Sequence, residues 1–313
     1  MARLPLAHIS WAIADNADRP ACDAFLMDLF GAESVYEMLV TPETAHYRFD
    51  REERLMVVGD TMLIPIAPAG PGAEPGNPLG DMLRRSAGEN RWIGLALRAA
   101  DLTAAGAWFR ARGFSLHYDR GMEDKYFLVT KRQALGIRIE VMQGELPNDP
   151  RVRPGWSAAR WRDDHPLGIE GLLSVDVAVP GFAEARAVLG GQLELPELSE
   201  RALPGEGLRG LAFDLGDVVV EALTGAALAD VQGLCGITFK VRSASAAADY
   251  LRGRGFALIG DVATRFAISP AEAHGRLIWL SETVPSGWPL PRALLREPEP
   301  FPPPLDDPAA AGD

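Results

Sequence analysis

The chain has 313 residues, of which 47% are hydrophobic and 24% are charged, and its formal net charge is −12. This length suits two domains of ordinary size, and the hydrophobic fraction is large enough to build buried cores. The negative charge excludes an extended nucleic-acid surface, which needs a basic patch, and disfavours docking on anionic membranes. We find no signal-peptide pattern and no apolar run of about 18 residues. We therefore expect a cytoplasmic protein.

Sequence motifs exclude several classes of site. The chain has two cysteines, Cys22 and Cys235, which are not spaced as metal ligands and which we expect to be reduced. It contains no P-loop, no G-x-S-x-G motif and no glycine-rich turn of the dinucleotide-binding kind. We therefore expect no nucleotide cofactor.

The predicted elements begin with a strand at residues 8–15 (HISWAIAD) and a helix over residues 19–30 that ends at Gly31. Three strand-like runs follow, ESVYEMLV, RLMVVGD and TMLIPIAP. The next segment, residues 67–90, carries several Gly and Pro, and we expect one short helix in it, over residues 79–86. This unit is the first of four.

A gapless internal repeat defines the second and fourth units. Residues 92–116 (WIGLALRAADLTAAGAWFRARGFSL) match residues 234–258 (LCGITFKVRSASAAADYLRGRGFAL). Each copy predicts a strand and an Ala-rich helix, and Gly113 and Gly255 mark where the helices end. Strand-like runs follow both copies: SLHYDR, KYFLVTKR and GIRIEVMQ after the second unit, and ALIGDV, TRFAIS and GRLIWLSE after the fourth.

The third unit is weaker. It has the strand-like run SVDVAVPG, a helix over residues 182–189 and two later strands, LRGLAFDL and DVVVEALTG. These patterns predict an N-terminal domain over residues 1–145, a linker over 146–166, a C-terminal domain over 167–285 and a Pro-rich tail over 286–313. We expect the C-terminal domain to fold when it is expressed alone.

Four tandem strand–helix–three-strand units resemble the vicinal-oxygen-chelate superfamily, which includes glyoxalase I, extradiol dioxygenases and bleomycin resistance proteins. The stretches HISWAIAD, GLALRAADLTAAGAWFRARGF and HPLGIEGLLSVDVAV carry the resemblance. It implies an α+β fold of four βαβββ modules, paired into two open eight-stranded cups. It also implies a small-molecule ligand. Because modules swap between chains in this family, a homodimer is possible.

The resemblance also implies that metal ligands come from the first and last strands of each module. Strand alternation places Ile9, Trp11 and Ile13 on the helix side, so His8 and Ser10 face the cup. On GIRIEVMQ the same alternation turns Arg138, Glu140 and Met142 toward the cup. The matching C-terminal positions offer only one carboxylate, so we expect that cup to be degenerate and structural: Ser174, Glu221, Gly236 and Trp279.

The N-terminal ligand set is incomplete, because Gly94 stands where a second histidine is needed and Ile64 where a further ligand is needed. We predict His8 and Glu140 as metal ligands, with His46 as the third and His117 as its alternative. Two histidines and a carboxylate suit iron, manganese or zinc. Two metal-free interpretations stay open: His8 and Glu140 act as an acid–base pair with the histidine titrating near neutrality, or they only line a pocket.

The segment HYDRGMEDKYF (residues 117–127) is dense in functional side chains, although a polar hairpin turn between two strands is the favoured interpretation. We predict His8, Glu140 and Tyr126 as catalytic residues, and a separate set as substrate-binding: Ser10, His117, Tyr118 and Arg138. The favoured function is a metal-dependent dioxygenase, isomerase or lyase acting on a small oxygenated molecule, with aromatic molecules among the candidates. The alternative is a metal-free protein that sequesters a small molecule.

Overall fold

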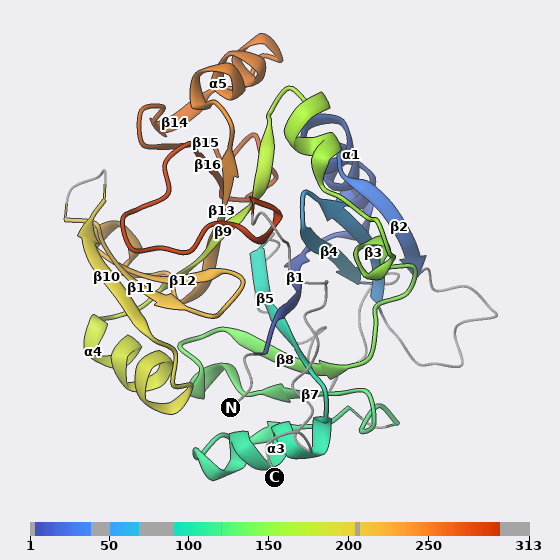
Figure 1. The fold of residues 1–313 in the computed structure, drawn as a ribbon, viewed down its shortest axis with the longest axis vertical. Helices are drawn as coiled ribbons and strands as arrows, with labels where there is room; N and C mark the ends of the chain where they lie inside the picture. Colours follow the sequence, from blue (N-terminus) through green and yellow to red (C-terminus); the bar gives the residue numbers. More distant parts are fainter. Residues whose placement is uncertain (1–3, 39–50, 69–90, 120, 204–206, 295–313) are drawn as a thin grey trace.

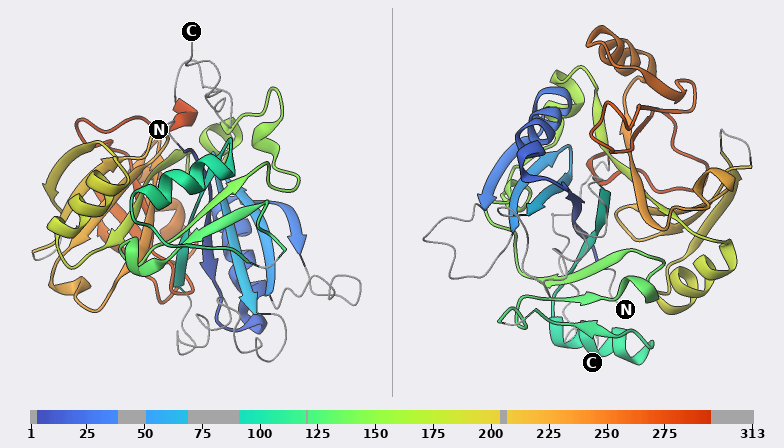
Figure 2. Two further views of the ribbon diagram at one scale, coloured as in Figure 1. Left: turned by 90° about the horizontal axis from the view of Figure 1, so that it is seen from below. Right: turned by 180° about the vertical axis from the view of Figure 1, so that it is seen from behind.

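The structure is a computed structural model that describes residues 4–38, 51–68, 91–119, 121–203 and 207–294. Its core is two mixed sheets of eight strands each, one from each half of the chain, which lie side by side (Figures 1 and 2). Each sheet is formed by two βαβββ modules, as the sequence predicts. None of the helices in these ranges has the length and apolar character needed to cross a bilayer.

The first sheet has the strand order β2-β3-β4-β1-β5-β8-β7-β6, so the two modules meet where β1 pairs with β5. In chain order its elements are β1 (Leu6–Ala12), α1 (Arg19–Phe30), β2 (Glu33–Met38), β3 (Arg51–Val58), β4 (Thr61–Pro68), β5 (Arg91–Ala99), α3 (Leu102–Ala111), β6 (Leu116–His117), β7 (Tyr126–Val129) and β8 (Arg138–Gln143).

The second sheet repeats this order as β10-β11-β12-β9-β13-β16-β15-β14. Its elements are β9 (Ile169–Ala178), α4 (Phe182–Ala185) with a π-helical turn (Arg186–Gln192), β10 (Glu197–Ala202), β11 (Arg209–Asp214), β12 (Val219–Thr224), β13 (Gly233–Val241), α5 (Ala244–Gly253), β14 (Leu258–Asp261), β15 (Arg265–Ile268) and β16 (Ile278–Ser281).

The gapless repeat is confirmed as two matching strand–helix units. The N-caps of α3 and α5 are Asp101 and Ser243, and each side chain accepts a hydrogen bond from the backbone N–H of the third residue of its helix. Both helices end before a glycine in the left-handed region, Gly113 at φ 84° and Gly255 at φ 89°. The sequence missed β10, because its residues are largely exposed at the sheet edge and show no apolar alternation.

Two aspartates join the halves in a reciprocal manner. Asp217, in the turn between β11 and β12, accepts a hydrogen bond from the backbone N–H of Leu6 at 2.9 Å. Asp60, in the turn between β3 and β4, accepts one from the backbone N–H of Leu172 at 3.0 Å. Leu6 and Leu172 occupy matching places on the first strands of their halves. Each half therefore holds the opening strand of the other.

Side chains also pack across the halves. Phe25 on α1 contacts Phe256 edge-on at a centroid distance of 6.1 Å. The buried Arg276 donates a hydrogen bond to the carbonyl of Cys22 at 3.0 Å and lies over the ring of Trp11 at 5.1 Å. Residues 150–164, within the predicted linker, form two short helical turns and bury Trp161. Independent folding of residues 167–285 stays a prediction.

Asp217→Asn tests the reciprocal contact. Burial raises the pKa of Asp217 from 3.8 to about 6. Its contribution to stability is therefore full below the unfolded pKa and is lost as the pH rises through about 6. Asn keeps an acceptor for Leu6 and does not ionise. We expect urea unfolding to show the variant gaining on the wild type, by on the order of 1–3 kcal/mol, between about pH 4.5 and 7.5.

Asp124→Asn, in an exposed turn, is the control and should leave the difference independent of pH. A flat difference for Asp217→Asn as well would show that this carboxyl group is not desolvated at the contact between the halves.

Candidate functional site

Two rows of side chains cross the floor of the N-terminal cup. Strand register aligns His8 on β1 with Ala96 on β5 and with Glu140 on β8. The next row aligns Ser10 and Gly94 with Arg138. Since neighbouring strands lie about 4.8 Å apart, side chains on β1 and β8 face each other across about 10 Å. The small residues of β5 leave the floor between them open.

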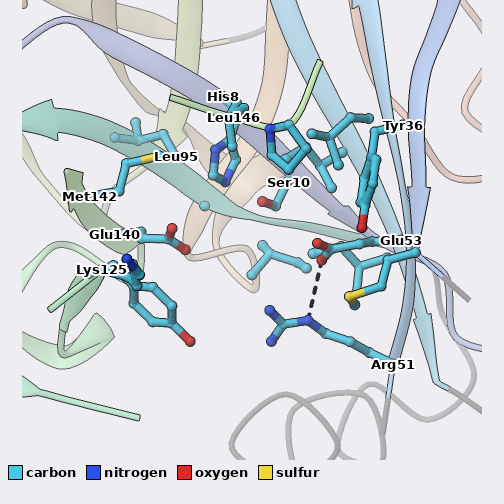
Figure 3. A pocket seen from close by; sticks show the side chains of 18 of the residues that line it. His8, Ser10, Tyr36, Arg51, Glu53, Leu95, Lys125, Glu140, Met142 and Leu146 are labelled. Carbon is cyan, nitrogen blue, oxygen red and sulfur yellow. Dashed lines mark ion pairs between the residues drawn. The ribbon is translucent and has the colours of Figure 1, made fainter. Parts of the chain in front are cut away.

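A cavity of about 350 Å³ occupies this cup. Figure 3 shows His8 and Glu140 pointing into it from two sides, with the Arg51–Glu53 ion pair (3.3 Å) on a third. Its walls are otherwise mostly apolar, as is usual for a small-molecule site. The lining includes Ser10, Tyr36, Met38, Leu55, Ile64, Ile66, Ile93, Gly94, Leu95, Met122, Lys125, Tyr126, Arg138, Met142 and Leu146.

His8 is neutral in this site. Burial lowers its pKa from 6.5 to about 3, and the charges of Arg151, Arg51 and Arg98 lower it further in the same direction. Arg151 lies behind β1, where it donates to the carbonyl of Ala7 at 2.9 Å and forms a two-point ion pair with Asp149. The Nδ1 atom of His8 is buried and has no hydrogen-bond partner among the described residues.

Glu140 is the group that titrates near neutrality. Burial raises its pKa from 4.5 to about 7, which Arg51 and Arg138 only partly oppose. Its carboxyl group lines the cavity and forms no hydrogen bond or ion pair with any residue in the described ranges. The acid–base interpretation of the sequence assigned this titration to His8. The electrostatics assign it to Glu140, because burial and, to a smaller extent, three nearby guanidinium charges keep His8 neutral.

Tyr126 lines the cavity, and its hydroxyl is held by a residue outside the cavity. Its hydroxyl donates to Asp119 at 2.6 Å, and the other oxygen of Asp119 lies 3.1 Å from Nε2 of the half-exposed His117. Burial and this hydrogen bond raise the pKa of Tyr126, so its phenol stays protonated. The three residues form a continuous hydrogen-bonded chain from the cavity wall to solvent.

The structure thus brings together five of the predicted site residues in one cavity: His8, Ser10, Tyr126, Arg138 and Glu140. It does not place the other two described ones there. His117 lies at the outer end of the chain through Asp119, and Tyr118 faces α3, where its hydroxyl accepts from Arg110 at 2.7 Å. His46 lies outside the described residues.

Sequence reasoning missed two groups that shape the site. Arg51 and Glu53 belong to β3, whose predicted run began only at Arg54, and Arg151 was assigned to a linker. A period-two reading extended to residue 51 would have placed Arg51 and Glu53 on the same face as Leu55. No sequence signal marks the contact of Arg151 with β1.

The described residues do not fit a divalent metal by themselves. A catalytic metal usually takes three protein ligands, and only His8 and Glu140 stand at ligand positions here. A Cβ atom at Gly94 would lie 1.9 Å from the carbonyl oxygen of Arg138, so no second histidine fits without moving β8. Within the described ranges, no group of three or more His, Cys, Asp or Glu side chains is placed to hold a metal ion.

The C-terminal cup carries a different arrangement. Glu221 is fully buried and accepts hydrogen bonds from Arg201 at 2.7 and 2.8 Å and from Arg265 at 3.2 Å. Arg265 also pairs with Asp176 at 3.0 Å and lies over the ring of Trp279 at 4.5 Å. The carboxylate at the ligand position is therefore neutralised by two guanidinium groups.

Comparisons with known proteins agree with this architecture. No family model matches the chain, and no curated protein matches it. Among solved structures, a variant of 4-hydroxymandelate synthase from Streptomyces coelicolor is 15% identical over 90% of this chain and 92% of that chain, with a TM-score of 0.61. The 2,3-dioxygenase LapB from Pseudomonas sp. KL28 is 12% identical over 93% and 97%, with a TM-score of 0.56.

A halotolerant catechol dioxygenase, BphC, is also 12% identical, over 93% of this chain and 91% of that chain, with a TM-score of 0.55. The chain therefore shares the fold of these structures, with two eight-stranded cups, as the resemblance predicted. At these identities the likeness defines the fold and leaves the reaction to the site itself.

Glu140→Gln and Glu221→Gln should have opposite effects on stability. Loss of the Glu221 charge removes the carboxylate partner of Arg201 and leaves Arg265 with Asp176 alone, so we expect a loss of about 3 kcal/mol or more in the free energy of unfolding. Glu140 has a raised pKa, so its ionisation costs stability as the pH rises through about 7. Glu140→Gln should match the wild type near pH 4, below the unfolded pKa of 4.5, and exceed it near pH 8 in chemical denaturation.

Equal losses in both variants at both pH values would mean that Glu140, like Glu221, is held by compensating contacts and is not poised to titrate.

Proposed function

We propose that the N-terminal cup is the active site of an enzyme that transfers a proton on a small organic substrate, with Glu140 as the acid–base group. The observation that carries this proposal is the state of Glu140, a carboxyl group that lines the cavity, has its pKa raised to about 7 and lacks any described ion-pair partner. An acid–base catalyst works best when its pKa lies near the working pH.

His8 supplies a neutral imidazole opposite Glu140. A neutral imidazole can donate one hydrogen bond without carrying charge, which suits stabilisation of an oxygen that becomes negative when a neighbouring C–H bond is broken. Glu140 would take that proton while His8 donates to the oxygen. The register rows place the two groups across the floor from each other, so a substrate lying over Ala96 meets both.

The rest of the wall supports orientation and exclusion of water. Tyr126 is held by Asp119 with its phenol protonated, and Arg51 is held by Glu53. Met38, Met122 and Met142 give an apolar surface that adapts to the shape of a ligand.

A second candidate is the metal-dependent reaction that the sequence favoured, of dioxygenase, isomerase or lyase type. Neutral His8 is the observation that supports it, because an unprotonated imidazole is the form that binds iron, manganese or zinc. It requires a further ligand from outside the described residues, such as His46. In the sequestering alternative the apolar cavity binds a ligand without chemistry, and neither His8 nor Glu140 is needed.

Solvent-deuterium exchange separates these functions. Incubation in D₂O with 2-oxobutanoate, acetoacetate and dihydroxyacetone, followed by proton NMR, reports enzyme-catalysed exchange next to a carbonyl. We expect the wild type to accelerate exchange and Glu140→Gln to lose about 10²–10⁴-fold of it. Because the carboxylate is the base, the rate should rise between about pH 6 and 8.

Glu184→Gln, on the exposed side of α4, is the control and should retain full exchange. Elemental analysis of protein purified without chelators accompanies the assay. Exchange that persists with EDTA supports the proposal. Exchange that vanishes with EDTA, together with stoichiometric metal that His8→Ala loses, supports the metal-dependent candidate. No exchange and no metal would leave sequestration as the function.

A further inference from the structure

Arg138 is a cation in the cavity wall that has no counterion among the described residues. It lies on β8 two residues before Glu140 and lines the cavity. No hydrogen bond or ion pair joins its guanidinium group to any residue in the described ranges. A guanidinium group stays charged even when burial lowers its pKa, as it does here. A buried cation of this kind is costly unless a ligand supplies the matching charge.

The other cations of the cavity are already engaged. Arg51 pairs with Glu53 at 3.3 Å, and the exposed Lys125 pairs with Asp124 at 3.2 Å. Glu140 attracts Arg138 from two positions along β8, but no hydrogen bond or ion pair joins the two side chains in the described ranges. The positive charge of Arg138 is therefore available to pair with a ligand in the cavity.

Ser10 completes this part of the floor. Register places Ser10 on β1 opposite Gly94 and Gly94 beside Arg138, so no side chain separates the hydroxyl from the guanidinium. Ser10 is buried and lines the cavity, and its hydroxyl makes no side-chain hydrogen bond within the described ranges. A hydroxyl and a planar guanidinium group together match the two oxygens of a carboxylate.

We propose that the substrate is a small organic acid with an apolar body, whose carboxylate is bound by Arg138 and Ser10. The apolar side chains around the cavity would cover the body of such a molecule, and the volume of about 350 Å³ is at the small end for ligand sites. This inference rests on the proposed function for the identity of the reacting centre, but the binding of the carboxylate is a separate property.

The two rows also fix how the acid lies. Residues two apart on a strand are separated by about 7 Å, which is the distance between the Ser10–Arg138 row and the His8–Glu140 row. A carboxylate held in the first row places the carbons that follow it beneath Glu140. An acid with a carbonyl or hydroxyl group next to or near its carboxylate would present that oxygen to His8.

Paired acids and amides test the proposal. Isothermal titration calorimetry would compare butanoate and 3-phenylpropanoate with butanamide and 3-phenylpropanamide, which have the same shape without the charge. We expect the wild type to bind at least one acid about tenfold more tightly than its amide. Arg138→Gln should remove that preference, and Arg138→Lys should retain part of it because the charge remains.

Arg132→Gln, an exposed arginine near the start of β8, is the control and should keep the preference. Thermal unfolding of each variant verifies that it is folded, and Arg138→Lys serves if Arg138→Gln is not. No preference for either acid in the wild type, or an unchanged preference in a folded Arg138→Gln protein, would overturn the assignment.

Glu140→Gln separates this inference from the proposed function. A charged Glu140 repels a bound carboxylate, so wild-type affinity for the acids should fall as the pH rises through about 7, while affinity in Glu140→Gln should stay constant. A retained acid preference without deuterium exchange would disprove the proton-transfer function and leave the carboxylate site standing. Exchange without the acid preference would do the reverse.

Discussion

The antiparallel pairing of β1 with β5 is the contact on which the N-terminal site depends. It joins the two modules of that half into one sheet and fixes which side chains share a row: His8 with Glu140, and Ser10 with Arg138. A shift by one residue would turn β1 over and send Ile9 and Trp11 into the cup in place of His8 and Ser10. The buried Ile9 and Trp11 in the core prevent that shift, so packing behind the sheet sets the chemistry in front of it.

The two cups of the chain show that one fold position serves two purposes. Glu140 and Glu221 both stand on last strands of their modules and both are enclosed by protein. Glu221 is surrounded by Arg201 and Arg265, which make it part of a buried charge network. Glu140 has no such partner among the described residues, and burial raises its pKa. A desolvated, uncompensated carboxyl group costs stability, and proteins retain such groups mainly at functional sites.

The site also depends on regions beyond its own sheet. Arg151, from the segment between the halves, lies behind β1 and keeps His8 neutral, while Asp217 of the C-terminal half holds Leu6 on the same strand. A change in the contact between the halves therefore acts on β1 directly. The C-terminal half therefore affects the site through its contact with β1, although none of its described side chains lines the cavity.

The sequence alone determined the repeated module, the strand alternation and therefore the fold class, because these depend on local periodicity and on an internal match. Alternation also placed His8, Ser10, Arg138 and Glu140 on the cup side of their strands. Only the tertiary structure decided which of these groups is charged. Desolvation by segments far apart in the chain lowers the pKa of His8, with smaller contributions from Arg151, Arg51 and Arg98. Desolvation also raises the pKa of Glu140 to near neutrality, against the opposing charge of Arg51. Local sequence patterns do not predict the distances between such remote segments. The roles of His8 and Glu140 could therefore be assigned only from the tertiary structure.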